Sequence, residues 1–196
     1  MQEIKLEETV DIVIGHTMTR SVKMQLDDAG VFILQSRDIK GGLYFSNTSS
    51  LKEVNILNPQ SSAFLQDGDI VLTGRMSQGA DVKVSIFKNS TSKKRVLATS
   101  SLFILRIKNP TLLPEYIVMF LNSTEGQKRL KRVLTQGTIQ SISSKQLKNI
   151  KIPVASLKEQ KLLVQLGVNL LEQQKILNRK MEINRKLSKN IINITK

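Results

Sequence analysis

Cysteine is absent from the 196 residues, and histidine occurs once, as His16. Without cysteine the chain forms no disulfide, carries no thiolate nucleophile and offers no sulfur ligand to a metal. A single histidine excludes a zinc site built from several histidines and argues against a histidine-dependent catalytic triad. We interpret His16, which directly follows Gly15, as a loop residue.

Several motifs of catalysis and membrane insertion are also missing. The sequence has no Gly-x-x-x-x-Gly-Lys phosphate loop and no Gly-x-Gly-x-x-Gly dinucleotide fingerprint. Segment 58–60 reads Asn-Pro-Gln, which is not the Asn-Pro-Pro-aromatic motif of amino-methyltransferases. No apolar run approaches the roughly 20 residues of a membrane span, and the acidic opening "MQEIKLEETV" is unlike a signal peptide. We therefore expect a cytoplasmic binding module without a catalytic residue, metal or bound cofactor.

Acidic residues are scarce in the middle of the chain, although the net charge is +14. Residues 1–70 hold 6 Lys/Arg and 10 Asp/Glu, residues 71–157 hold 15 and 3, and residues 158–196 hold 9 and 3. Such a regional excess attracts polyanions. Nucleic acid is the first candidate partner, an anionic membrane is the second, and a basic surface without a partner is the third. Asp67 and Asp69 could form a metal pair, but Asp-Gly-Asp between two strands is typical of a turn.

Apolar runs separated by turn residues predict an α+β fold, with a mixed α/β domain at residues 1–155. Strands are expected at 10–14, 31–34, 70–73, within 82–87, within 98–108 and just before Pro153. A helix is expected over 114–134. Pro114 suits its first turn, and its apolar face would hold Tyr116, Met119, Phe120 and Leu130. Its basic end, Lys128, Arg129, Lys131 and Arg132, complements the helix dipole and need not touch a ligand.

Residues 156–196 predict one long coiled-coil helix. Ser156 and Glu159 have the spacing of a capping box, and the forty residues that follow hold no proline. Heptad a positions fall at Leu163, Leu170, Leu177, Asn184 and Ile191, and d positions at Leu166, Gln173, Lys180, Leu187 and Ile194. Most are apolar, and a polar Asn at position a can fix register. A helix folded onto its own domain is the alternative. However, a length of about 50 Å exceeds the roughly 30–40 Å of the domain, which favours a projecting helix with a partner.

Polar and basic loops after the strands are the candidate DNA-binding segments, because a rigid scaffold positions such loops. Arg can read guanine and Gln or Asn can read adenine in the major groove, while Lys mostly meets phosphate. A solvated loop side chain remains the alternative for each residue. The candidates are Thr17, Thr19, Arg20, Lys23, Arg75, Ser77, Gln78, Lys83, Lys88, Asn89, Lys93, Lys94 and Arg95, with Thr138 and Gln140 from the later segment "GTIQSIS".

The chain resembles the specificity subunits of type I restriction–modification systems almost end to end. The blocks that carry the resemblance are "IKLEETVDIVIGHT", "VFILQSRDIKGG", "LQDGDIVLTGR", "LFILRIKNPTLLPEYIVMFLNSTEGQKRL" and "GTIQSISSKQLKNIKIPVASLKEQKLL". The last is the most specific, with Gly-x-x-Gln, Ile-Ser, a strand ending in Ile-Pro and Glu-Gln opening the helix. The family's proline-rich turn after Ile-Pro is reduced here to Pro153.

The resemblance implies a half-length subunit with one target recognition domain and one spacer helix. A full member has two such domains joined by two long helices, so this chain is either a natural half-subunit or part of a longer one. A homodimer through the helix would then read a bipartite, palindromic site in double-stranded DNA. Partner modification subunits would bring S-adenosylmethionine and methylate adenine, and a restriction subunit could join them. This chain would bind no cofactor itself.

Two other functions remain open at the level of sequence. The basic surface and the coiled coil could serve a protein-interaction adaptor without sequence-specific DNA binding. A truncated methyltransferase or nuclease is the enzymatic alternative, although no motif supports it.

Overall fold

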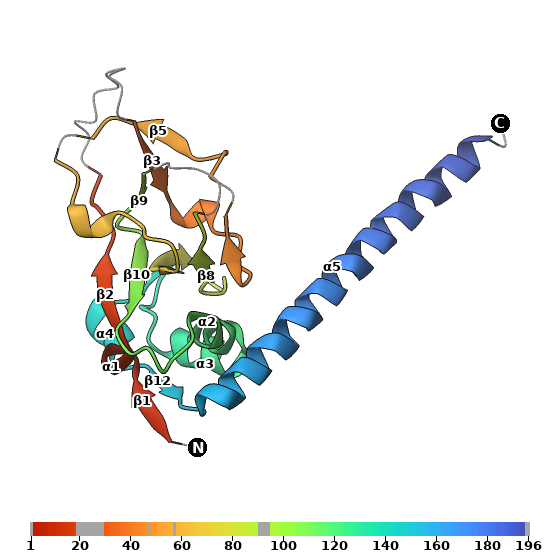
Figure 1. Cartoon of the computed structure of the whole chain (residues 1–196). Helices are drawn as coiled ribbons and strands as arrows, with labels where there is room; N and C mark the ends of the chain where they lie inside the picture. The colour runs from red at the N-terminus through yellow and green to blue at the C-terminus, as the bar shows by residue number, and fades with distance from the viewer. Residues whose placement is uncertain (1, 19–29, 47, 57, 90–94, 195–196) are drawn as a thin grey trace.

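The protein is described by a computed structural model that covers residues 2–18, 30–46, 48–56, 58–89 and 95–194, with side chains up to residue 189. A mixed α/β body is followed by one long helix, α5 (Leu157–Ile194), which leaves the body and projects far beyond it (Figure 1). The expected α+β class and the long C-terminal helix are confirmed. The division at residues 155 and 156 remains a prediction, because the first turns of α5 pack against the body.

A five-stranded sheet forms the centre of the body. Its order is β2 (Val10–Ile14), β10 (Leu102–Ile107), β6 (Ile70–Thr73), β8 (Val84–Phe87) and β4 (Tyr44–Phe45). Neighbours are antiparallel except β4 and β8. The central strands are buried on both faces: Phe103 and Leu105 of β10 join one core cluster, whereas Leu102 and Ile104 join another. This two-sided burial explains why these strands are nearly continuous apolar runs.

A smaller sheet of β5 (Lys52–Val54), β3 (Val31–Leu34) and β9 (Val96–Ala98) covers the second cluster. Short 3₁₀ turns η1 (Ser36–Asp38) and η2 (Ser61–Ala63) lie beside it. We expected a single strand within 98–108, and the first part of this prediction was wrong, because Ala98 ends β9 and β10 begins only at Leu102. The chain turns at 99–101, where the Leu102 N–H donates to the Thr99 carbonyl at 2.9 Å, so β9 and β10 belong to different sheets. His16 lies after β2 as expected, in a bridge to Thr99.

Helices α2 (Pro114–Asn122) and α3 (Thr124–Arg132) cover the other face of the central sheet (Figure 1). Pro114 occupies the first turn, as predicted. The expected continuous helix over 114–134 was wrong, because the chain breaks at Ser123. Its hydroxyl accepts a hydrogen bond from the Gly126 N–H at 3.2 Å and so caps a new helix. A Cβ on Gly126 would lie 2.0 Å from the Phe120 carbonyl oxygen, so the two helices meet where only glycine fits.

Two short helices and two short strands complete the described part of the body near the start of α5. Helix α1 (Leu6–Thr9) follows β1 (Glu3–Lys5), and helix α4 (Ser144–Lys148) precedes β12 (Lys151–Pro153). Strands β1 and β12 pair antiparallel, so the first residues of the chain lie beside the entry to α5.

Candidate nucleic-acid interface

Two predicted DNA-binding segments form one two-stranded ribbon. Strand β7 (Arg75–Ser77) pairs antiparallel with β11 (Ile139–Ser141), which is more than sixty residues later in the sequence. Ile139 lies opposite Ser77, and Ser141 lies opposite Arg75. The Gln78 N–H donates to the Thr138 carbonyl at 2.9 Å and extends the pairing by one step. The structure therefore brings together Arg75, Ser77, Gln78, Thr138 and Gln140, which the sequence had placed in separate loops.

The ribbon is held to the central sheet through Gly74. Its N–H donates to the Ser101 carbonyl at 2.8 Å, and its carbonyl accepts from the Ile142 N–H at 3.0 Å. Ile142 is buried in the core beneath. The turn beyond β7 contains Gly79 at φ 81° and the approach to β11 contains Gly137 at φ 125°. Glycine is favoured at both places because other residues rarely adopt these angles.

One face of the ribbon is exposed and the other meets the core. Met76 packs against the core, and Gln140 opposite it is half-buried. Because side chains alternate along a strand, Arg75, Ser77, Ile139 and Ser141 share the outer face. Within the described part of the chain, the side chains of Arg75 and Ser77 form no hydrogen bond or ion pair. Donors and a hydroxyl are thus presented to solvent on a two-stranded ribbon, and a ribbon of this width fits the major groove of B-DNA.

Ile139 is the residue of this face that sequence reasoning missed. Its side chain is 72% exposed, although isoleucine is usually buried. The alternation of side chains along a strand could have identified it. Ile142 is buried in the core, and a residue three positions away in an extended segment faces the opposite side. An exposed aliphatic group on a DNA-reading surface can contact the methyl group of thymine.

Helix α5 begins at a joint with three polar anchors. Ser156 and Glu159 form the predicted capping box: the Glu159 N–H donates to the Ser156 hydroxyl at 3.3 Å, and the Ser156 N–H donates to the Glu159 carboxylate at 2.8 Å. The Ser156 hydroxyl also donates to this carboxylate at 2.7 Å, and this bond, followed by the bond from the Ser156 N–H, lowers the pKa of Glu159. Gln160 is only 1% exposed. Its oxygen accepts from the Leu113 N–H at 2.9 Å, and its amide donates to the carbonyls of Thr111 and Ala155 at 2.9 Å each.

Beyond the joint, α5 lies on α2 for a few turns and then leaves the body. Val164 and Val168 pack against the core, and a Cβ on Gly167 would lie 1.9 Å from the Met119 methyl group. The apolar residues of the predicted heptad seam lie on another side of α5 and are exposed. The accessible fractions are 44–57% for Leu163, Leu166, Leu170, Leu177 and Leu187. Asn184 is exposed in the same seam, and the side chain of Ile191 is not among those described. Leu162, Ile176 and Ile183 widen this face.

An exposed ribbon on a small α/β body, followed by a projecting helix with an unpaired apolar face, defines an architecture with known relatives. Residues 1–192 match the family described as Type I restriction modification DNA specificity domain. The chain belongs to this family.

The specificity domain spans only about 40% of the length of the relatives that it matches. It is 29% identical over 184 residues to the specificity subunit of the type I restriction enzyme MjaVIII of Methanocaldococcus jannaschii, covering 93% of this chain and 40% of that protein. The fold is similar to that of the HsdS subunit of Thermoanaerobacter tengcongensis, with a TM-score of 0.61 and 21% identity over 91% of this chain and 39% of that one. It is also similar to the type I S subunit of M. genitalium, with a TM-score of 0.55 and 18% identity over 94% and 42% of the two chains.

The remaining DNA-binding candidates of the specificity domain are not gathered on the ribbon. Lys88 lies 5.5 Å from the Tyr44 ring centre and Arg95 lies 4.3 Å from that of Phe64, so both cations have aromatic partners within the chain. The Asn89 N–H donates to the Asp67 carboxylate at 2.8 Å, Lys83 is half-buried, and Thr17 is exposed after β2. Thr19, Arg20, Lys23, Lys93 and Lys94 lie outside the described residues.

The Asp-Gly-Asp segment is a turn, as predicted. Asp69 is 4% exposed and accepts from the Gln66 N–H at 2.8 Å and from the Arg106 guanidinium at 3.1 Å. Burial raises the pKa of Asp69, while the hydrogen bond from Gln66 and the pairing with Arg106 oppose that rise. Over the described residues, no three His, Cys, Asp or Glu side chains are placed to hold a metal ion. No helix in the described ranges has the length and apolar character of a membrane span.

Proposed function

We propose that this specificity domain is the DNA-recognition subunit of a type I restriction–modification system. It reads a few base pairs of double-stranded DNA, catalyses nothing itself, and directs adenine methylation by modification subunits that carry S-adenosylmethionine. A restriction subunit joins the same assembly where cleavage occurs.

Helix α5 is the observation that carries this proposal. Its 38 residues span about 57 Å at 1.5 Å per residue. Beyond its first turns, the apolar face of α5 is not covered by the described part of the body, and leaving it in water is unfavourable. A second copy of α5 offers the same heptad pattern, and pairing around a two-fold axis covers both faces at once. The helix pair then sets the distance between the two recognition domains.

The length of α5 predicts the form of the DNA site. About 57 Å corresponds to roughly 17 base pairs at 3.4 Å each. Two domains at the ends of a helix pair read two short segments and leave the bases between them unread. Because a two-fold axis relates the copies, the two segments are inverted repeats. The ribbon supplies the base-reading groups, with Arg75 suited to guanine and the exposed Gln78 suited to adenine.

Methylome sequencing of the host with and without this gene tests the proposal. We expect a bipartite adenine motif with palindromic halves that disappears when the gene is removed. An unchanged set of methylated adenines after deletion would refute the assignment. Exchange of Arg75 and Gln78 for Ala should alter or abolish the motif, because base contacts specify the sequence.

A protein-interaction adaptor is the second candidate, and the wide apolar face of α5 is the feature that favours it. In that case the chain would have negligible affinity for DNA even at low salt, where electrostatic binding is strongest.

A further inference from the structure

Helix α3 carries four cations near its C-terminal end. Arg129 and Lys131 are paired with acidic side chains of the described residues, whereas Lys128 and Arg132 are not. Arg129 is used within the fold: it pairs with Glu3 at 2.7 Å and Glu125 at 2.9 Å, and donates to the Lys151 carbonyl at 2.9 Å. Lys128 and Arg132 form no ion pair with any described residue, and both are exposed or partly exposed. Lys131 reaches across to Asp81 at 2.6 Å.

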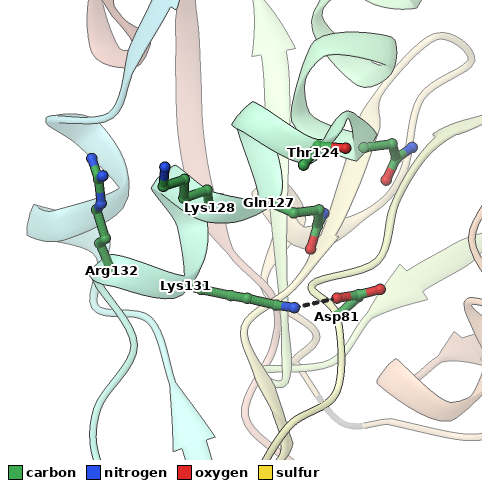
Figure 2. Close-up of a pocket in the computed structure, with 7 residues that line it drawn as sticks. Asp81, Thr124, Gln127, Lys128, Lys131 and Arg132 are labelled. Atoms are coloured by element: carbon green, nitrogen blue, oxygen red, sulfur yellow. Dashed lines mark ion pairs between the residues drawn. The ribbon is translucent and has the colours of Figure 1, made fainter.

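Lys128, Lys131 and Arg132 line an open groove of about 670 Å³, which we call the α3 groove. Its walls include Asp81, Gln127, Lys128, Lys131 and Arg132 (Figure 2). Figure 2 shows Lys131 extended to Asp81, whereas Lys128 and Arg132 are joined to none of the residues drawn. Asp81 is the acidic residue among the described residues that line the groove, and Lys131 already neutralises it.

Arg132 also lines a second groove of about 360 Å³ between α3 and α4, which we call the α3–α4 groove. Lys145 of α4 and Lys151 of β12 contribute to it, and no acid is found among its described lining residues. The helix dipole can account for cations at the end of α3. It does not account for Lys145 and Lys151, which come from other elements and converge on the same place.

Both grooves border the DNA-reading ribbon. Asp81 and Val82 lie in the turn that follows β7, and Gln127 of α3 bonds to both the N–H and the carbonyl of Val82, at 3.1 and 2.8 Å. On the other side, α4 follows β11 after two residues. The positive potential is felt by Glu125, whose pKa is lowered first by its hydrogen bond from Arg129 and further by the charges of Arg129, Lys128 and Arg132.

We infer that the α3 groove and the α3–α4 groove bind the phosphate backbone of double-stranded DNA beside the bases that the ribbon contacts. This inference rests on the proposed function, but the contact itself is independent of sequence. Phosphate contacts fix the position of a protein on the duplex and carry no sequence information. Lys128, Arg132 and Lys145 are the phosphate-binding residues, while Lys131 holds the ribbon turn through Asp81. An acidic surface of a partner protein is the competing occupant.

The test uses the 196-residue chain and a random duplex of about 30 base pairs, with binding measured by fluorescence anisotropy between about 50 and 200 mM salt. The variant combines Lys128→Gln, Arg132→Gln and Lys145→Gln, which are surface changes that leave Arg129 and the Lys131–Asp81 pair intact. Each lost phosphate contact lowers the slope of log K against log salt by roughly 0.9. We expect the slope to fall by about 2 to 3 in this variant.

The matched control combines Lys175→Gln, Arg179→Gln and Arg185→Gln at exposed positions of α5 outside the heptad seam, which removes the same charge. Its slope should stay close to that of the unmodified chain. Equal slopes in the two variants, or no DNA binding by the unmodified chain, would overturn the inference. So would a groove variant that binds DNA normally but loses its modification subunit. Failure of the proposed function is seen separately, as a methylated motif that persists without the gene.

Discussion

At the scale of single residues, the outer face of the ribbon decides which chemistry meets the DNA. Sequence reasoning selected Arg75, Ser77, Thr138 and Gln140 because they are polar and lie near glycines. It did not consider which face of a strand each occupies. The pairing of β7 with β11 turns Gln140 toward Met76 and the core, and leaves Ile139 beside Ser77 on the outside. The polar character of the surface was predictable, but its one exposed aliphatic side chain was not recognised.

Ile139 should contribute to recognition of thymine. Replacing a thymine by uracil in the recognised half-site removes one methyl group, and burial of such a group is worth about 0.8 kcal/mol. The unmodified chain, in complex with its modification subunit, should therefore bind the uracil duplex roughly fourfold more weakly at one position of the half-site. Ile139→Ala should lose this difference.

The control for this experiment is Ile14→Ala, since Ile14 is also exposed, at 47%, but belongs to β2, which is not part of the ribbon. It should keep the full preference for thymine. Identical responses to uracil in the Ile139→Ala variant and the unmodified chain would show that Ile139 does not touch the base.

At the scale of elements, the joint between the body and α5 depends on Gln160. A buried amide is costly unless its hydrogen bonds are made, and all three bonds of Gln160 connect the first turn of α5 to the loop before α2 and to the residue that precedes Ser156. The side chain therefore fixes the helix both along its axis and in rotation. Together with the capping box, it explains why the Ser-x-x-Glu-Gln stretch follows β12 so closely.

Gln160→Ala should destabilise the joint. The change leaves the partly buried Leu113 N–H without its acceptor, and an unsatisfied buried group costs about 1–3 kcal/mol. We expect the free energy of unfolding, measured by urea denaturation, to fall by this amount. Gln165→Ala, five residues along the same helix at an exposed position, should change it by less than about 0.5 kcal/mol. Equal losses in the two variants would mean that the three hydrogen bonds do not hold the joint.

Local signals predicted the elements of this fold better than their connections. The strands at 10–14, 31–34 and 70–73 and the capping box of α5 follow from apolar runs, turn residues and cap spacing, and the structure confirms them. The break at Ser123 was missed although no apolar side chain lies between Leu121 and Leu130, and the close approach of Gly126 to Phe120 is a tertiary contact that the sequence does not report. The pairing of residues 75–77 with 139–141 joins segments far apart in sequence, and no local pattern reports such a pairing. The ribbon therefore had to be seen in the structure.

At the scale of the whole molecule, charge and apolar surface are separated. The cations of the grooves lie on the body next to the ribbon, whereas the exposed leucines and isoleucines run along α5. The body is thus suited to a polyanion and the helix to a protein. The apolar face of α5 includes Leu162, Ile176 and Ile183 besides the predicted seam, so it is wider than a two-stranded coiled coil needs. A helix pair could cover the seam and still leave apolar surface for a modification subunit.

Paired Leu170→Glu and Leu177→Glu changes should convert a dimer into a monomer, because each places a charge in the apolar seam. Sedimentation equilibrium would give the mass. The control pair, Gln165→Glu and Asn178→Glu, adds the same charge at exposed positions outside the seam and should leave the dimer intact. If the unmodified chain has the mass of a monomer at every concentration, α5 does not join two copies by itself.

Because α5 is long, a small change of its angle at the Gln160 joint produces a large displacement of its far end. A tilt of about 5° at the base of a helix of roughly 57 Å displaces the far end by about 5 Å, which exceeds the 3.4 Å rise of one base pair. An angular error too small to disturb any single contact would therefore shift the spacing between two half-sites by a whole base pair. The close contact of Gly167 with Met119, about two helical turns beyond Gln160, supports the base of α5 at a second point and so resists that tilt.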